Sequence, residues 1–153
     1  MPTDTSEPTF YTSVFRHGVD EKRRVQIPAR WRPASPDTEF TFFLWPNGNL
    51  AEACLMGLPP AEMRVLAEKL RGMSHSDPKA SALRRLLGSK SASLGLDKAG
   101  RVCLPEWMTK SVGIGKEAVL VGLVDRFEIW NPERYEAASA VDQVMLPEAF
   151  KLI

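Results

Sequence analysis

The sequence predicts an α+β protein built from two similar units of β-strands, with helices between the units and after them. Three observations support this fold class: a motif that recurs 77 positions later, short strand-like segments that flank both copies, and amphipathic segments outside them. The chain has 153 residues, of which 44% are hydrophobic and 25% charged. These values are typical of globular proteins and exclude collagen-like, coiled-coil and disordered chains.

The repeated motif is the strongest of these observations. Residues 18–28 (GVDEKRRVQIP) align with residues 95–105 (GLDKAGRVCLP), with identical glycine, aspartate, arginine, valine and proline positions. The same offset continues without a gap, so that residues 42–44 fall on residues 119–121 and Leu50 falls on Phe127. A constant offset of this kind indicates a duplicated unit.

Each unit is predicted to open with a hairpin. Residues 10–19 and 89–96 are short extended stretches, and the DxxxR sequence that follows each is a turn. The return strands are residues 24–27 and 101–104, because apolar and polar side chains alternate along them.

A short helix is expected after each return strand. Pro28 and Pro105 cannot continue a central strand, but proline suits the first turn of a helix. Residues 29–31 and 106–108 therefore begin these helices.

A second hairpin completes each unit. In the first copy, residues 40–45 form a strand that turns at Pro46-Asn47-Gly48-Asn49 and returns through Leu50, since Asn-Gly is a strong hairpin signal. In the second copy the corresponding segments are residues 118–123, the turn 124–126 and the return strand 127–130.

Helices are predicted between and after the units. Residues 60–71 and 78–87 carry apolar stripes, and a third helix starts at Asn131-Pro132 and runs towards Val144. Such stripes indicate core or subunit contact. Their members are Met63, Leu66, Ala67 and Leu70 in the first helix, and Leu83, Leu86 and Leu87 in the second.

The formal net charge of +1 argues against a uniformly basic nucleic-acid-binding protein, but the charge is unevenly distributed. Residues 14–32 carry a net charge of +4, and the matching residues 91–109 carry none. Residues 62–90 carry +4, whereas residues 116–153 carry −3. The first repeat and the helical segment after it are therefore basic, and the C-terminal part is acidic.

No sign of catalysis or of a cofactor is present. Cys54 and Cys103 have no metal-ligand spacing and are expected as buried apolar thiols, and neither His17 nor His75 has a partner at nucleophile or metal spacing. We therefore expect no enzyme, no cofactor, no metal and no small-molecule substrate. The first residues are polar, and the longest apolar run, residues 118–124, is too short to span a membrane. Both features predict a soluble cytoplasmic protein.

The two motifs, Asp20-Glu21-Lys22-Arg23-Arg24-Val-Gln-Ile-Pro28 and Asp97-Lys98-Ala99-Gly100-Arg101-Val-Cys-Leu-Pro105, resemble the DxxGR-[LIV]-x-[LIV]-P signature of the MraZ family of bacterial transcriptional regulators. The resemblance covers about residues 10–138. It implies tandem SpoVT-AbrB (swapped-hairpin) units that form one pseudo-twofold β-barrel with peripheral helices.

On this resemblance the chain divides into five segments. Residues 1–9 are a flexible tail, 14–56 the first SpoVT-AbrB unit, 57–90 a helical linker, 91–134 the second unit, and 135–153 a C-terminal helix and tail.

The resemblance also implies partners and a location. Members assemble into closed rings, often octamers or larger, and bind short direct repeats of double-stranded promoter DNA. They regulate, commonly as repressors, the gene cluster for cell division and the cell wall, which implies association with the nucleoid.

The predicted DNA-binding residues lie in and near the DxxxR turns, with Arg24 as the main one by analogy with the family. A hairpin tip can enter a groove of DNA, where guanidinium groups reach phosphates or guanine O6 and N7. The predicted set is Arg24, Lys22, Arg23, Arg16, Arg101 and Lys98.

A structural role for the same turns stays open. Asp20 and Asp97 are predicted to form their turns by accepting backbone N–H groups, and Arg24 would then only pair with Asp20. The family's turn glycine is kept as Gly100 but replaced by Arg23, which would cost about 1 kcal/mol if the position needs a positive φ.

Two functions remain after the sequence analysis. The first is a sequence-specific, oligomeric DNA-binding regulator. The alternative is a structural or assembly module that keeps the barrel and the ring without specific DNA recognition.

Overall fold

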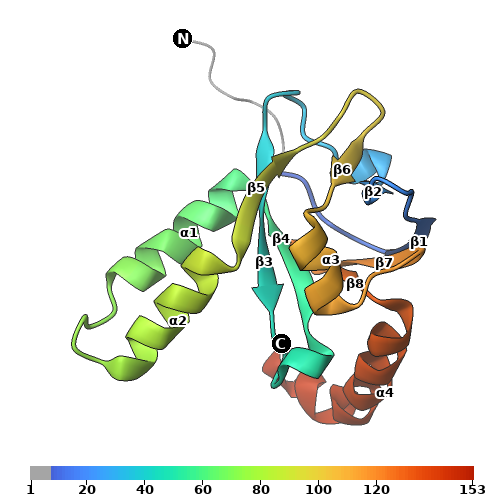
Figure 1. Ribbon diagram of the computed structural model, residues 1–153. Helices are drawn as coiled ribbons and strands as arrows, with labels where there is room; N and C mark the ends of the chain where they lie inside the picture. Colours follow the sequence, from blue (N-terminus) through green and yellow to red (C-terminus); the bar gives the residue numbers. More distant parts are fainter. Residues whose placement is uncertain (1–7) are drawn as a thin grey trace.

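The described residues form an α+β fold, as predicted, with one large antiparallel sheet, a separate two-stranded ribbon and four α-helices (Figure 1). The computed structural model describes residues 8–153, so most of the predicted tail at residues 1–9 lies outside the described residues. The strands are β1 Val14–Gly18, β2 Arg24–Gln26, β3 Glu39–Trp45, β4 Cys54–Leu58, β5 Ser91–Gly95, β6 Arg101–Cys103, β7 Glu117–Gly122 and β8 Phe127–Trp130. The α-helices are α1 Pro60–Arg71, α2 Pro78–Ser89, α3 Glu106–Val112 and α4 Pro132–Ala149.

The strands of the two repeats are interleaved in the six-stranded sheet, whose order is β1-β7-β8-β4-β3-β5. The first strand of each repeat pairs with a strand of the other repeat, β1 with β7 and β5 with β3. The second strands, β2 and β6, pair with each other and form the ribbon. The predicted hairpin of the first unit is therefore wrong beyond its turn, because β1 and β2 are joined only at the single bridge Val19–Val25. Neither repeat can therefore complete its backbone hydrogen bonds alone.

The pairing has pseudo-twofold symmetry. In the ribbon Val25 lies opposite Val102, and in the centre of the sheet Met56 lies opposite Glu128. On either side of this central pair, Leu55 faces Ile129 and Gly57 faces Phe127. The duplication in the sequence is thus matched by an approximate twofold axis in the structure.

The repeat offset is not constant along the chain, and the predicted alignment of residues 42–44 with residues 119–121 is wrong by one position. Phe40 and Phe42 belong to the main core, as do Ala118 and Leu120, which lie 78 positions later. Because successive side chains of a strand point to opposite faces, an offset of 77 would align side chains of opposite faces. One extra residue in the second repeat, between Pro105 and β7, accounts for the shift.

The predicted return through Leu50 in the first repeat is also wrong. After β3 the chain forms a loop and a 3₁₀ turn at Leu50–Glu52, and the returning strand β4 begins at Cys54. Asn47 and Gly48 both have positive φ, but the side-chain amide of Asn47 donates to the carbonyls of Trp45 and Glu52, which stabilises a wider loop than a two-residue turn. The second repeat keeps the predicted hairpin, with β7 and β8 joined near Val124.

The short helices after the ribbon strands differ in length. The first is a single 3₁₀ turn, Ala29–Trp31, because Pro33 follows closely and cannot donate a helical hydrogen bond. The second continues to Val112 as α3. Both begin directly after the prolines, as predicted.

An aromatic cluster fills the main core between the sheet and the ribbon. The ring of Phe127 lies 5.1 Å from that of Trp31, 5.2 Å from that of Phe40 and 5.8 Å from that of Phe42, measured between centroids. All four side chains are at most 1% exposed. Residues of both repeats therefore share one core.

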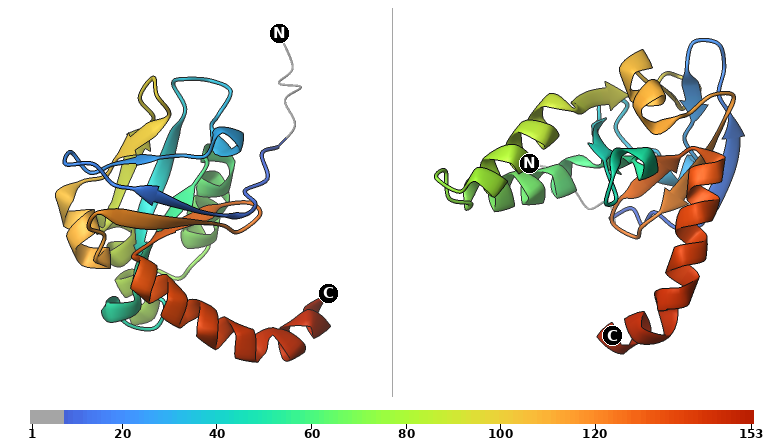
Figure 2. Two further views of the ribbon diagram at one scale, coloured as in Figure 1. Left: turned by 90° about the vertical axis from the view of Figure 1, so that its right-hand side faces the viewer. Right: turned by 60° about the horizontal axis from the view of Figure 1, so that its bottom comes forward.

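Two helical arms leave this body. The helices α1 and α2 pack on the opposite face of the sheet, against Phe43, Met56 and Leu58, and α4 packs near Trp130 through Tyr135 and Ala138. Figure 2 shows the α1–α2 pair and α4 extending away from the strands in different directions. Within residues 8–153, no helix has the length and apolar character that a membrane span requires.

A test of this core uses Gly57, whose position leaves room for the Phe127 ring. A Cβ atom at Gly57 would lie 2.6 Å from that ring, well inside contact distance. We expect Gly57→Ala to lower the free energy of unfolding by about 1–3 kcal/mol, measured by urea denaturation.

The matched control is Gly88→Ala in α2, where a Cβ meets nothing within 4 Å. That change should be neutral or stabilising by up to about 1 kcal/mol, because alanine favours helix. Equal stability of wild type and Gly57→Ala would contradict the packing described.

Candidate nucleic-acid interface

The first DxxxR turn is organised by the Asp20 carboxylate. Its Oδ1 accepts the backbone N–H groups of Lys22 and Arg24, each at 2.9 Å, and its Oδ2 accepts Nε of Arg24 at 2.6 Å. The backbone N–H of Arg23 donates to the Asp20 carbonyl at 2.9 Å and closes the turn. The Asp20 carboxylate thus accepts three hydrogen bonds within its own turn.

The second turn repeats this arrangement. Asp97 Oδ1 accepts the N–H groups of Ala99 and Arg101 at 3.0 and 2.9 Å, and Oδ2 accepts Nε of Arg101 at 2.9 Å. Gly100 donates its N–H to the Asp97 carbonyl. The two turns are therefore equivalent in their hydrogen bonds.

These bonds stabilise the ionised carboxylates. The backbone N–H of Arg24, together with the Arg24 guanidinium, holds the pKa of Asp20 below its ordinary value. The backbone N–H and guanidinium of Arg101 lower the pKa of Asp97 in the same way. Both turns therefore depend on a charged aspartate.

The ribbon ties each turn to the other repeat. Gln26 in β2 donates from Nε2 to the Ala99 carbonyl at 2.7 Å, and Cys103 in β6 donates from Sγ to the Lys22 carbonyl at 3.2 Å. Nη1 of Arg101 lies 3.9 Å from Asp20 Oδ2. The two turns thus form one continuous surface. Cys103 is exposed, so its predicted burial is wrong, whereas Cys54 is buried and both thiols are free.

Arg23 and Gly100 occupy equivalent positions, and both have positive φ, 60° and 81°. Arg23 donates from Nε to the Leu104 carbonyl at 3.0 Å. On the Gly100 side, Arg32 lies over the glycine and donates from Nε to the Ile27 carbonyl, also at 3.0 Å. The carbonyls of Leu104 and Ile27 occupy equivalent positions after the ribbon strands, and each accepts a hydrogen bond from one guanidinium. Arg23 supplies the first of these and Arg32 the second.

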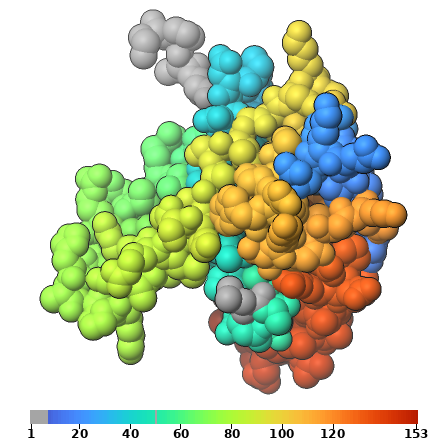
Figure 3. Space-filling model, in the orientation of Figure 1, coloured from blue at the N-terminus to red at the C-terminus, as the bar shows by residue number. Residues whose placement is uncertain are grey.

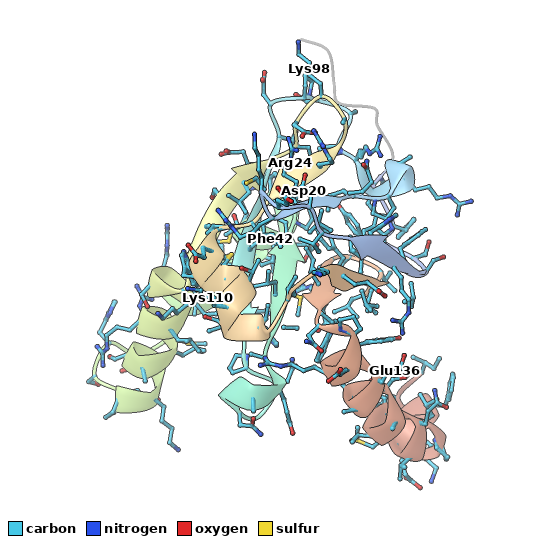
Figure 4. The ribbon with its side chains drawn as sticks, turned by 45° about the vertical axis from the view of Figure 1, so that its right-hand side comes forward. Asp20, Arg24, Phe42, Lys98, Lys110 and Glu136 are labelled. Atoms are coloured by element: carbon cyan, nitrogen blue, oxygen red, sulfur yellow. The ribbon has the colours of Figure 1, made fainter. Side chains whose placement is uncertain are left out.

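The remaining predicted site residues fall into two groups. Lys22 and Lys98 are exposed at the turns, and Figure 4 shows Lys98 at the tip of its hairpin and Asp20 beside Arg24. Arg24 and Arg101 keep about a third of their side-chain surface exposed. Arg16 is separate, because it pairs with Glu117 at 3.3 Å and with Glu136 of α4 at 2.6 Å.

A hollow beside the ribbon contains two arginines that the predicted site lacks. It is lined by Ser13, Phe15, His17, Gln26, Pro28, Ala29, Arg30 and Arg32. Arg30 is exposed in the middle of the 3₁₀ turn, and Nε2 of His17 is buried without a hydrogen-bond partner among the described residues. The net charge of +4 over residues 14–32 is the feature of the sequence from which Arg30 and Arg32 could have been included among the predicted DNA-binding residues.

The part of the chain that the structure describes contains no group of three histidine, cysteine, aspartate or glutamate side chains placed to hold a metal ion.

Comparison with known proteins gives one consistent family. A family model described as "MraZ protein, putative antitoxin-like" matches residues 89–149. The chain is 35% identical over 126 residues to the transcriptional regulator MraZ of Thermomicrobium roseum, covering 80% of this chain and 82% of that protein. It is 36% identical over 121 residues to the protein of the same name from Symbiobacterium thermophilum, covering 79% and 83% of the two chains. The match to that of Clostridium tetani is 33% over 122 residues, covering 80% and 82%.

The charge on the two turn aspartates should make stability depend on pH. Because their pKa values are lowered in the folded state, they stabilise it above the ordinary aspartate pKa, and this contribution is lost as the pH falls through their folded pKa values. We expect the double variant Asp20→Asn/Asp97→Asn to be less stable than wild type at pH 7 and this difference to shrink in acid. Thermal unfolding at a series of pH values measures it.

Asp37→Asn, a change at an exposed aspartate before β3, is the control and should follow the wild-type curve. A difference between the double variant and wild type that stayed constant into acid would contradict the role of the charge.

The asymmetry between Arg23 and Gly100 gives a second test. Gly100→Ala forces a side chain into positive φ and displaces Arg32, so it should lower the free energy of unfolding by about 1–3 kcal/mol. Arg23→Gly loses one hydrogen bond but gains backbone freedom, and these effects of about 1 kcal/mol each should nearly cancel. Urea unfolding of both variants checks this, and a larger loss for Arg23→Gly would reverse our interpretation.

Proposed function

The chain belongs to the MraZ family, and from this we propose that it is a sequence-specific DNA-binding regulator of transcription. The relatives named transcriptional regulator MraZ support the general function. The observation that carries the DNA-binding site is the pair of equivalent DxxxR turns on one ribbon, each with an oriented arginine and a nearby exposed lysine.

The turn geometry suits a positioned arginine. The Nε bond to Asp20 fixes the plane of the Arg24 guanidinium and leaves its two Nη groups for a phosphate or for guanine O6 and N7. Lys22 lies two positions away and adds a flexible positive charge. In the second turn the Nε bond to Asp97 orients Arg101 in the same way, but its Nη1 also lies 3.9 Å from Asp20 Oδ2, and Lys98 lies three positions away.

We assign the larger contribution to the first turn. The segment at residues 14–32 has a net charge of +4, whereas the matching segment at residues 91–109 has none. Arg30 and Arg32 lie close to the first strand of the ribbon and extend this basic surface. Arg16 also belongs to this segment, but its side chain pairs with Glu117 and Glu136. We therefore assign it a smaller contribution to DNA contact than the sequence analysis did.

The proposed architecture is a pseudo-twofold barrel of two swapped-hairpin units, residues 14–56 and 91–134. The six-stranded sheet has β1 and β5 at its edges, and the ribbon connects to both through the two DxxxR turns. The helical linker at residues 57–90 and the C-terminal residues 135–153 are peripheral in this scheme.

We propose that affinity comes from a ring of protomers on short direct repeats. One ribbon offers few phosphate contacts, and several ribbons on one DNA molecule multiply weak binding by orders of magnitude. By analogy with the family, the target is the promoter of the division and cell-wall gene cluster, the effect is repression, and the protein lies at the nucleoid.

An assembly module without specific DNA recognition is the second candidate. One observation favours it: Nε of both Arg24 and Arg101 already bonds to the aspartate of its own turn. The two functions differ in whether the arginines also reach DNA.

A gel shift with the chain's own upstream promoter DNA separates these candidates. We expect Arg24→Ala to weaken binding at least about tenfold, because each protomer loses a charge-assisted hydrogen bond to DNA, and Arg101→Ala to weaken it less. Lys22→Ala should reduce the slope of log affinity against log salt concentration by about 1 for each phosphate that the lysine neutralises.

Lys69→Ala, an exposed charge on α1, is the control and should bind like wild type. Tight binding that survives both arginine changes would overturn the site assignment. The absence of binding to any promoter repeat would favour the assembly module.

A further inference from the structure

The C-terminal arm, residues 141–153, has an unusually apolar surface. Of the fourteen large apolar side chains that are exposed among the described residues, seven lie in this arm. They are Val141, Val144, Met145, Leu146, Phe150, Leu152 and Ile153. Such a concentration is typical of a surface that is covered by another molecule.

The arm receives little cover from its own protomer. The first half of α4 is held by Tyr135 and Ala138 on the Trp130 cluster and by Glu136 on Arg16. No residue of α4 is buried, and the helix extends away from the strands in both views of Figure 2. The exposed apolar side chains are therefore free to contact a partner.

A groove of suitable chemistry lies on the other arm, between α1 and α2. Its apolar floor is formed by Phe43, Met63, Ala67, Leu70 and Leu87, and its volume is about 360 Å³. Arg71, His75 and Arg84 also line it, and all three are exposed. Figure 3 shows the α1–α2 arm projecting from one side of the molecule, with α4 on another.

The two arms have opposite charge. Residues 60–90 carry seven basic and three acidic side chains, a net charge of +4. Residues 141–153 carry Asp142 and Glu148 against Lys151, a net charge of −1. The C-terminal arm, which is apolar with a small negative charge, therefore matches a basic groove with an apolar floor. The opposite sign of the two charges favours this contact over one between two basic α1–α2 pairs.

We propose that the C-terminal arm of one copy docks in the α1–α2 groove of a second copy. The two surfaces leave the same protomer in different directions (Figure 1), so the contact joins unlike surfaces of neighbouring copies. Contacts of this kind produce rings when the rotation closes. The inference rests on the proposed ring and names the surfaces that build it.

The docking is tested by cross-linking between copies of the full chain. One variant carries Leu152→Cys and the other Ala67→Cys, both with Cys103→Ser to remove the exposed native thiol. After the two are mixed and oxidised, we expect at least about five times more mixed disulfide than for Leu152→Cys mixed with Glu133→Cys. A yield equal to that control would overturn the proposal.

A second measurement, sizing with light scattering at micromolar concentration, keeps the two proposals separate. Val144→Lys with Leu152→Lys should reduce the oligomer to monomer, whereas Phe10→Lys, a change at an exposed apolar side chain elsewhere, should not. An oligomer that persists in the double variant would refute this contact and leave the ring proposal standing. A wild-type monomer would refute both, and DNA binding is read independently in the gel shift.

Discussion

The structure depends on the pairing of each repeat with strands of the other. The strand β1 has no partner of its own repeat in the sheet, and the same holds for β5. Because unpaired backbone groups are costly when buried, the two repeats must fold together. The common aromatic core has the same origin, since Phe127 of the second repeat packs against Trp31, Phe40 and Phe42 of the first. The position of the DxxxR turns follows from this interleaving, because it brings β2 and β6 together.

The local elements could be predicted from the sequence, but some registers could not. Turn chemistry and alternation locate β1, β2 and β6, because each of these strands has one face more buried than the other. The strands β7 and β8 are buried on both faces, and their hairpin is located by the turn residues 124–126. In β3, Phe42 and Leu44 face the main core while Phe43 faces the α1–α2 side. A strand that is buried on both faces has no alternation from which to determine its register. The shift of one position and the late start of β4 are errors of this kind.

The contacts of the DxxxR turns were predictable to a similar extent. A short aspartate side chain that is followed by backbone N–H groups forms a local turn in most contexts, so Asp20 and Asp97 follow from the motif. The partners of Arg23 and Arg16 do not, because Leu104, Glu117 and Glu136 are distant in the chain. The substitution of the turn glycine by Arg23 looked like a loss of backbone freedom. The structure shows a compensation: Arg23 donates to the Leu104 carbonyl, as Arg32 donates to the equivalent Ile27 carbonyl in the half that keeps the glycine.

The two halves share the features that stabilise the fold and differ in the charge of their surfaces. Where the halves agree, at the aspartate turns and the central β4–β8 pairing, the residues stabilise the shared fold. The halves differ in two ways. The first half has more basic side chains near the ribbon, and the helices that follow the halves differ in charge: the basic α1–α2 pair follows the first half, and the acidic α4 follows the second. A symmetric chain would present two like-charged arms that repel each other. One basic and one acidic arm per protomer instead provide the two unlike surfaces that the proposed head-to-tail assembly requires.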